Sequence, residues 1–217
     1  TRLTAEQNLT SPVRLEYGEA TIKESNKKEG EVELTEIGAT VYDLQTNGSV
    51  ARRIKVYEDG KISAVWTSSL DEDPYPARGT GYNHYNGTSW GSIPTGRIEP
   101  ERCGWPNIGS FDDDGTEKEY LITHIAKTTG ESGGYFYSEN GSVGSSNWSS
   151  IEREKQVGPI WFRTATDGNG EIHMIGTYPL DESAPSQVTL KGVERPTVYY
   201  KYNPVEDTFA YTQFMLP

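Results

Sequence analysis

Large and polar side chains alternate over short stretches of this chain, and turn signals separate the stretches. The clearest example is GYNHYNGTSWG, residues 81–91. Within it Tyr82 to Tyr85 alternate, Asn86-Gly87 is the strongest two-residue turn signal, and residues 88–90 run back. This pattern predicts a β-hairpin. Because an isolated hairpin is only marginally stable in water, it must belong to a larger sheet.

The hairpin pattern recurs along the chain. Three Asp/Gly turns each precede a β-like run, and Asp59, Asp114 and Asp167 in these turns are 55 and then 53 residues apart. The runs are EDGKISAVW at 58–66, DDGTEKEYLITH at 113–124 and DGNGEIHMIGT at 167–177.

A second hairpin pattern follows each turn, at residues 81–91, 133–151 and 197–214, and Trp90, Trp148 and Phe209 fall at matching places in the returning strands. Two hairpins, and therefore four strands, in about 55 residues is the size of one β-propeller blade. The sequence therefore predicts an all-β chain with about three four-stranded blades, at residues 50–100, 101–158 and 159–217.

Residues 1–49 are predicted to be an N-terminal extension, with ATVYDLQT (39–46) as an extra strand and the Lys/Glu-rich segment 19–32 as an exposed lead-in. Propellers usually close with four to eight blades, so three predicted blades make only part of a ring. We therefore expect a fragment, a processed piece, or a protomer that completes its ring with another chain. The chain ends where a blade would end, so further blades are expected to follow in a parent protein.

Composition supports a strand-rich chain, since 14 Tyr, 5 Trp and 5 Phe accompany 23 Gly and 12 Pro. The net charge of −12 argues against nucleic acid as a partner and suits a soluble, outward-facing protein. No apolar run is long enough to span a bilayer. Thr1 begins in polar sequence, so any signal peptide has been removed or never existed. The single cysteine, Cys103, excludes a disulfide scaffold and is interpreted as a packing residue.

Arg53 and Arg163 lie at roughly equivalent positions before their turns, and Arg102 precedes the strand of the middle blade. Arginines gathered near a propeller axis could clamp a carboxylate bidentately. The alternative is that they pair with the many acidic residues of this chain. The sequence leaves both interpretations open.

The segment ARRIKVYEDGKISAVW is similar to the opening blade of sialidases, although Lys55 replaces a proline and no complete Asp-box is present. A sialidase needs a Tyr nucleophile with a Glu partner and an acidic Asp. Asp71 and Asp73 are the candidate acids, but we expect the Tyr/Glu pair to lie in later blades. Hydrolysis by this chain alone is therefore not expected.

No metal or cofactor is predicted, with calcium as the alternative at the acidic stretches SLDEDPY (69–75) and FDDDGTE (111–117). Neither stretch matches an EF-hand loop, and Asp-Gly is primarily a turn signal. His84, His124 and His173 share no ligand spacing and are interpreted as ordinary strand residues.

Tyr82, Trp90 and Trp148 are candidates for stacking on sugar rings, which would give a lectin-like surface. The competing interpretation is that the tryptophans, which recur at matching blade positions, pack between blades.

Several segments resemble a known group of proteins: GATVYDLQTNGSVARRIKVYEDGKISAVWTSS, RGTGYNHYNGTSWG, RIEPERCGWPNIG and IWFRTATDGNGEIHMIGTYP. In this order, over residues 37–217, they resemble secreted β-propeller proteins of Bacteroidota that are often labelled sialidase-like. Those proteins usually carry a C-terminal sorting domain for the type IX secretion system. The sialidase label rests on fold analogy, which does not establish activity, and no catalytic residue carries over.

The resemblance implies a secreted or cell-surface location, with a signal peptide removed before Thr1. It also implies further blades and a sorting domain after Pro217, so the partners would be translocon components or the rest of a longer chain. The sequence therefore predicts a binding or structural module with an adhesive or glycan-contacting role. The alternatives are a sialidase-type glycoside hydrolase, with Arg53 and Arg163 as its carboxylate clamp, and a blade array that assembles with copies of itself.

Overall fold

The computed structural model describes residues 34–45, 52–126, 132–151, 158–178, 189–190, 193–194 and 196–212. The chain divides into two compact units, Thr1–Thr35 and Glu36–Pro217, and every strand belongs to the second. The predicted lead-in at 19–32 lies outside the described residues. Among the residues that are described, none lies in a helix that could cross a membrane.

The first sheet has three antiparallel strands in chain order: β1 (Ile54–Val56), β2 (Ile62–Ser68) and β3 (Gly79–Tyr85). The β1–β2 turn needs glycine, because Gly60 has a φ of +82°, a conformation that other residues rarely adopt. Where the sequence predicted a returning fourth strand, a single bridge joins Tyr85 to Trp90.

The other two large sheets have four antiparallel strands each. The second contains β4 (Gly104–Asp113), β5 (Thr116–Ala126), β6 (Ser132–Glu139) and β7 (Trp148–Ile151). The third contains β8 (Ile160–Thr166), β9 (Ile172–Thr177), β12 (Thr197–Asn203) and β13 (Thr208–Thr212). A separate two-stranded hairpin, β10 (Thr189–Leu190) and β11 (Val193–Glu194), intervenes between β9 and β12.

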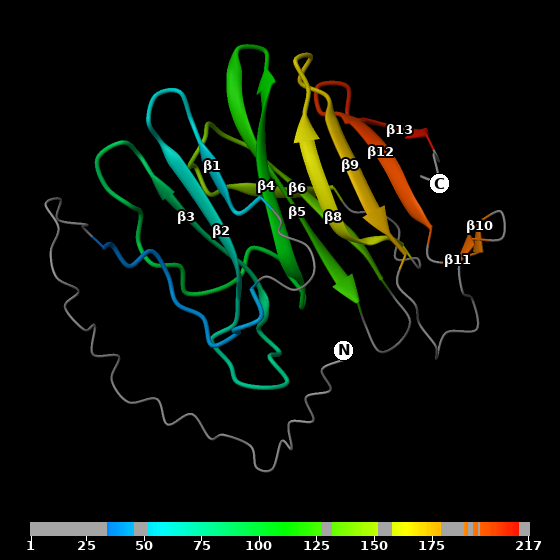
Figure 1. The fold of residues 1–217 in the computed structure, drawn as a ribbon. Helices are drawn as coiled ribbons and strands as arrows, with labels where there is room; N and C mark the ends of the chain where they lie inside the picture. The colour runs from blue at the N-terminus through cyan, green and yellow to red at the C-terminus, as the bar shows by residue number, and fades with distance from the viewer. Residues whose placement is uncertain are drawn as a thin grey trace, which may run out of the picture. The chain divides into compact units, whose positions relative to one another are not determined.

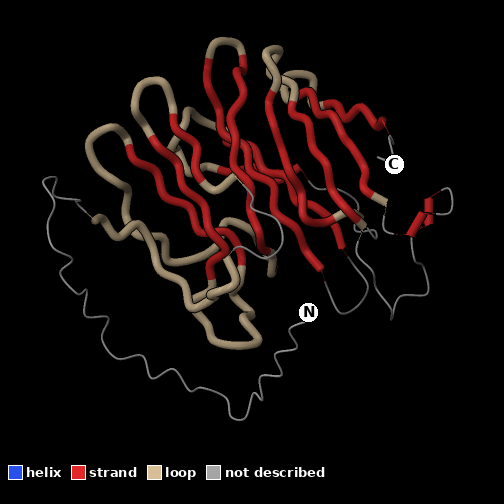
Figure 2. The backbone as a smooth tube through the Cα atoms, viewed as in Figure 1, coloured by secondary structure: helices blue, strands red, loops and turns tan. Residues whose placement is uncertain are grey.

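The three large sheets lie side by side, with the first strand of each, β1, β4 and β8, next to one another (Figure 1). The β1–β2, β4–β5 and β8–β9 hairpin tips all project at one end, at the top of Figure 1. Figure 2 shows strands joined by loops and no helix in the described chain. The all-β prediction is therefore confirmed. The described sheets do not close into a ring, so the propeller itself stays a prediction.

The predicted extra strand at 39–46 is not a strand over its described residues, 39–45. Side chains of the segment hold it instead, through hydrogen bonds to the backbone at the end of β2. The Gln45 carboxamide accepts from the Thr67 N–H at 3.0 Å and donates to the Thr67 carbonyl at 2.6 Å. This glutamine side chain hydrogen-bonds to the β2 backbone at Thr67, beyond the residues of β2 that pair with β1.

The second sheet is buried on both faces. Along β5, Tyr120 and Ile122 pack into a cluster with the third sheet, whereas Leu121 packs on the other side with Cys103 and Tyr137. This follows from the two-residue period of a strand, which sends neighbouring side chains to opposite faces. The cluster toward the third sheet consists of Phe111, Tyr120, Ile122, Phe136, Phe162, Ile172, Met174, Val198, Tyr200 and Tyr202.

One buried side chain, Asn107 on β4, links β4 to β8 and to the segment that leads into β1. Its Oδ1 accepts from the Arg52 N–H at 3.1 Å, and its Nδ2 donates to the Phe162 carbonyl at 2.7 Å. The next residue, Ile108, donates its backbone N–H to the Arg52 carbonyl at 3.0 Å. Neighbouring sheets therefore share hydrogen bonds as well as apolar contacts.

We predict that Asn107→Asp will destabilise the fold by about 2–4 kcal/mol, because a buried carboxylate would face the Phe162 carbonyl without a donor hydrogen. The matched control is Asn147→Asp, since Asn147 is exposed. Urea unfolding would measure both free energies. Equal midpoints for the two variants would show that Asn107 does not hold the sheets together.

Candidate functional site

Two tryptophans occupy matching backbone irregularities at the start of β4 and β8. The pairing register shifts between Gly104 and Asn107 in β4, and between Ile160 and Arg163 in β8. Trp105 and Trp161 lie within these bulges, and each has a φ of +54°. A bulky residue rarely adopts this left-handed conformation, and bulges often re-aim side chains at functional sites.

The two indole rings belong to one row of contacting side chains. The Arg78 guanidinium lies 4.5 Å from the centroid of the Trp105 ring, and His124 stacks on that ring at 4.9 Å and 4°. Trp161 meets His124 edge-on at 6.2 Å and donates its backbone N–H to His124 Nδ1 at 3.3 Å. We give the name arginine–tryptophan cluster to Arg78, Trp105, His124 and Trp161, together with Arg53 and with Arg163, which follows Trp161 by two residues on β8.

His124 is neutral in this cluster. Its complete burial, and secondarily the nearby Arg78 charge, lower its pKa from 6.5 to about 3. The imidazole therefore adds no charge, and the arginines supply the positive charge of the cluster.

Arg78 is only 6% exposed, yet its hydrogen bonds go to neutral groups. Its Nε donates to the Cys103 carbonyl at 2.9 Å, and its Nη1 donates to the Tyr42 hydroxyl at 3.4 Å. Burial, followed by repulsion from Arg102, lowers the pKa of Arg78. The ion stays charged because arginine starts from so high a pKa.

Arg53 reaches the same region from the first sheet. Its Nη2 donates to the Gln45 carbonyl at 2.8 Å, and its Nη1 lies 3.5 Å from the Thr67 hydroxyl. That hydroxyl also accepts from the Trp105 N–H at 3.1 Å, which links Arg53 to the bulge. Burial lowers the pKa of Arg53 to about 10.

The arginines of this cluster have no carboxylate partner among the described residues. The ion pairs found there use lysine or histidine: Lys55–Glu117, Lys61–Asp59, Lys118–Asp113, His173–Asp167 and Lys201–Glu171. Among the described residues the Arg163 guanidinium makes one hydrogen bond, to the Phe162 carbonyl at 3.4 Å. Because a guanidinium carries five N–H donors, Arg53, Arg78 and Arg163 each keep donors that could bind an anion.

Two of the three predicted arginines are next in sequence to residues that share one hydrogen-bonding partner. Asn107 joins the backbones of Arg52 and Phe162, the immediate neighbours of Arg53 and Arg163. Arg102 is exposed on a loop, where it donates to the carbonyls of Tyr75 and Pro74, and its charge is close enough to Arg78 to lower the pKa of that residue.

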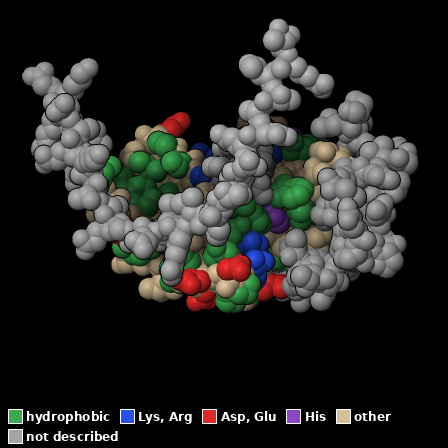
Figure 3. Space-filling view, turned by 60° about the horizontal axis from the view of Figure 1, so that its bottom comes forward, with side chains coloured by type: hydrophobic (Ala, Val, Ile, Leu, Met, Phe, Trp, Pro, Cys, Tyr) green, Lys and Arg blue, Asp and Glu red, His purple; other side chains and the backbone are tan. Residues whose placement is uncertain are grey.

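The face opposite the hairpin tips is seen in Figure 3. Lys, Arg and His side chains lie there among hydrophobic ones, whereas Asp and Glu gather toward the lower rim of the view. This is the end at which β4 and β8 begin, and therefore the end that carries the two bulges.

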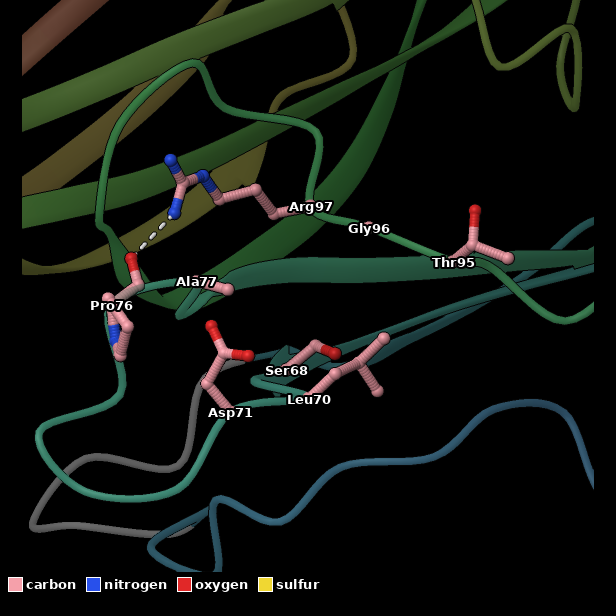
Figure 4. A pocket seen from close by; sticks show the side chains of 8 residues that line it. All are labelled: Ser68, Leu70, Asp71, Pro76, Ala77, Thr95, Gly96 and Arg97. Carbon is pink, nitrogen blue, oxygen red and sulfur yellow. Dashed lines mark hydrogen bonds between the residues drawn. The ribbon is translucent and has the colours of Figure 1, made fainter.

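Asp71 and Asp73 lie together in the loop after β2. Asp71 lines a pocket of about 410 Å³ with Arg97 (Figure 4). The Arg97 guanidinium does not pair with this carboxylate and donates instead to the Pro76 carbonyl at 2.9 Å. The same loop ends at Arg78 of the arginine–tryptophan cluster, but no ion pair joins Asp71 or Asp73 to an arginine among the described residues.

The predicted sugar-stacking aromatics lie in packed surroundings. Tyr82 is buried and meets the Trp148 ring edge-on at 5.3 Å. Trp90 is half-buried and contacts the Tyr85 ring at 5.7 Å. These contacts favour packing for Tyr82 and Trp148, and sugar stacking stays a prediction for Trp90. Trp161, at 39% exposure, is the more accessible ring of the arginine–tryptophan cluster.

Sequence reasoning missed a buried Tyr–Glu network between the first and second sheets. The hydroxyls of Tyr57 and Tyr82 both donate to the fully buried Glu119 carboxylate, the latter at 2.5 Å. Burial, and next the Glu119 charge, raise the pKa of both phenols. A tyrosine nucleophile needs easier deprotonation, so these two phenols serve instead as hydrogen-bond donors to a buried carboxylate.

Glu139 is a second buried carboxylate beside this network. Its Oε1 accepts from the Ser145 hydroxyl at 2.9 Å and the Ser146 N–H at 3.0 Å, whereas its Oε2 has no partner among the described residues. Burial, and next repulsion from Glu119, raise its pKa from 4.5 to about 7.

No protein-family model matches the chain, and no curated protein matches it. Two solved structures are similar to the chain at 13% identity. One is a polysaccharide lyase of family PL25, an ulvan lyase, bound to -[GlcA(1-4)Rha3S]-, with a TM-score of 0.41. The other is a structure of the same type of lyase, with a TM-score of 0.40. Each comparison covers 73% of this chain and 42% of the lyase chain. A likeness at this level carries no inference about activity.

We predict that Glu139 makes the fold less stable as pH rises from about 4.5 to about 7, because the unfolded chain releases this proton before the folded chain does. Glu139→Gln should remove that slope. The variant should match wild type near pH 4.5 and exceed its free energy of unfolding by on the order of 2 kcal/mol above pH 7. Urea unfolding across this pH range, with the exposed Glu206→Gln as control, measures the effect; parallel wild-type and Glu139→Gln curves would refute it.

Proposed function

We propose that this chain is the binding portion of a secreted or surface-displayed β-propeller protein and that its arginine–tryptophan cluster binds a carboxylate-bearing sugar. One observation carries the proposal. In a chain of net charge −12, Arg53, Arg78 and Arg163 have no carboxylate partner among the described residues. Although the protein is rich in acidic residues, these partly buried arginines donate to backbone carbonyls. Their remaining N–H donors are available for an external anion.

The chemistry of the cluster suits an acidic sugar better than a bare ion. Guanidinium groups bind carboxylates through paired N–H donors, and an exposed indole ring packs on the apolar face of a sugar. Arg53 and Arg163 supply the donors, and Trp161 supplies the ring. His124 is neutral beside them, so the selectivity for a negative charge rests on the arginines.

The proposed architecture and location rest on two supports. Three antiparallel meander sheets lie side by side through their first strands, as the blades of a propeller do. The segments that resemble secreted Bacteroidota propellers support export by a type IX system, with translocon components or the rest of a longer chain as partners.

A binding role is preferred to sialidase-type hydrolysis because of the Tyr57–Glu119–Tyr82 network. Its members are buried, and the raised pKa values of the two phenols keep them protonated. Such phenols are donors to a carboxylate and not nucleophiles.

The test is calorimetric titration with sialyllactose and with an oligogalacturonate, using lactose as the neutral comparison. Binding of an acidic saccharide is expected, weakening with added salt, with no binding of lactose. Arg53→Gln and Arg163→Gln should each weaken binding by about tenfold or more, because each removes a charged hydrogen-bond donor.

Arg97→Gln is the matched control, since Arg97 also donates only to carbonyls but lies by the Asp71 pocket. Its affinity should equal that of wild type. Equal binding of lactose, or unchanged affinity in both Arg53→Gln and Arg163→Gln, would contradict the proposal. Release of sialic acid from sialyllactose would instead favour the hydrolase.

A further inference from the structure

The β8–β9 hairpin brings an imidazole and two carboxylates together at the end of the third sheet that lies opposite Trp161. Asp167 begins the loop, Glu171 ends it, and His173 follows on β9. Each offers one ligand atom, and these atoms all lie within 4.8 Å of one another. Glu171 and His173 are two residues apart, which places them on the same side of an extended chain.

We propose that Asp167, Glu171 and His173 form a binding site for a divalent transition-metal ion, for which Zn²⁺ is the best fit. One imidazole nitrogen and two carboxylate oxygens suit a borderline ion, whereas Ca²⁺ prefers oxygen ligands alone. All three side chains are half-buried, so they are accessible to an ion while their positions are restrained.

A residue outside the three ligands orients the imidazole. The Tyr199 hydroxyl, on the neighbouring strand β12, lies 2.5 Å from His173 Nδ1. This contact directs His173 Nε2 toward Asp167 Oδ2, 3.2 Å away. Metal-binding histidines usually have such a second partner on the other ring nitrogen, which fixes the ring and its tautomer.

The Asp167 carboxylate is also held in place. Its Oδ1 accepts from the N–H groups of Asn169 and Glu171, at 2.8 and 3.0 Å, which leaves Oδ2 facing the imidazole.

A cation already contacts one ligand of the site. The Lys201 ammonium lies 2.7 Å from Glu171 Oε1, and Lys201 is directly opposite His173 in the β9–β12 register. A metal ion must therefore displace or share this contact. The ammonium lowers the affinity of the site for the ion, and removing it should raise that affinity.

The experiment is calorimetric titration of the folded chain with Zn²⁺ alone, together with NMR of the ring nitrogens of the three histidines. We expect one site. His173→Gln should weaken it by about tenfold or more, and Tyr199→Phe should weaken it with all three ligands intact. Lys201→Met should tighten it by roughly threefold to tenfold. The matched control, His84→Gln, should bind as wild type does.

The NMR signals of the histidine rings distinguish this site from nonspecific binding. Among the three histidines, only His173 should change its ring-nitrogen chemical shifts with Zn²⁺, with the largest change at Nε2. Unchanged affinity in His173→Gln, an equal loss in His84→Gln, or no Zn²⁺ binding by either wild type or Lys201→Met would each overturn the proposal. Tighter binding of Ca²⁺ than of Zn²⁺ would overturn the assigned ion class. The site is separate from the arginine–tryptophan cluster, so failure of the sugar titration does not affect it.

Discussion

The rest of the structure depends on how Asn107 satisfies peptide groups at the junction of three sheets. Strands that begin neighbouring sheets do not form continuous ladders with one another, so their facing peptide groups need other partners. A carboxamide has both a donor and an acceptor, and Asn107 uses them on the Phe162 carbonyl and the Arg52 N–H. Fixing these two points fixes the paths of β1 and β8 relative to β4.

The bulges and the arginine–tryptophan cluster follow from that junction. Asn107 is the first paired residue after the bulge in β4, and Phe162 lies within the corresponding bulge in β8. The same link therefore sets where Trp105 and Trp161 turn into their left-handed conformations. Arg53 and Arg163 are next in sequence to the two bridged residues, Arg52 and Phe162.

The handling of charge explains why this region remains available for a ligand. Two buried carboxylates accept hydrogen bonds from neutral groups: Glu119 from two phenols, and Glu99 from the backbone N–H and hydroxyl of Thr80. Arginine side chains instead donate hydrogen bonds to backbone carbonyls. Although each sign of charge is numerous enough to pair with the other, these buried carboxylates accept from hydroxyl and peptide donors, and these guanidiniums donate to carbonyl and hydroxyl oxygens.

The sequence by itself determined the strands and their turns, because these depend on neighbouring residues. Alternation predicted β3, the β-like run after an Asp/Gly turn predicted β9, and Asp114-Gly115 predicted a turn whose two residues both have positive φ. Only the tertiary structure decided the rest. Gln45 bonds to Thr67 in place of a predicted strand, Arg78 lies over the Trp105 ring, and Glu119 accepts a hydrogen bond from Tyr57. The members of these three pairs lie 27 residues apart or less in the first two cases, 22 for Gln45 and 27 for Arg78, and 62 residues apart in the third. No local pattern encodes such pairs, because each depends on how the sheets pack and on where a bulge aims one side chain.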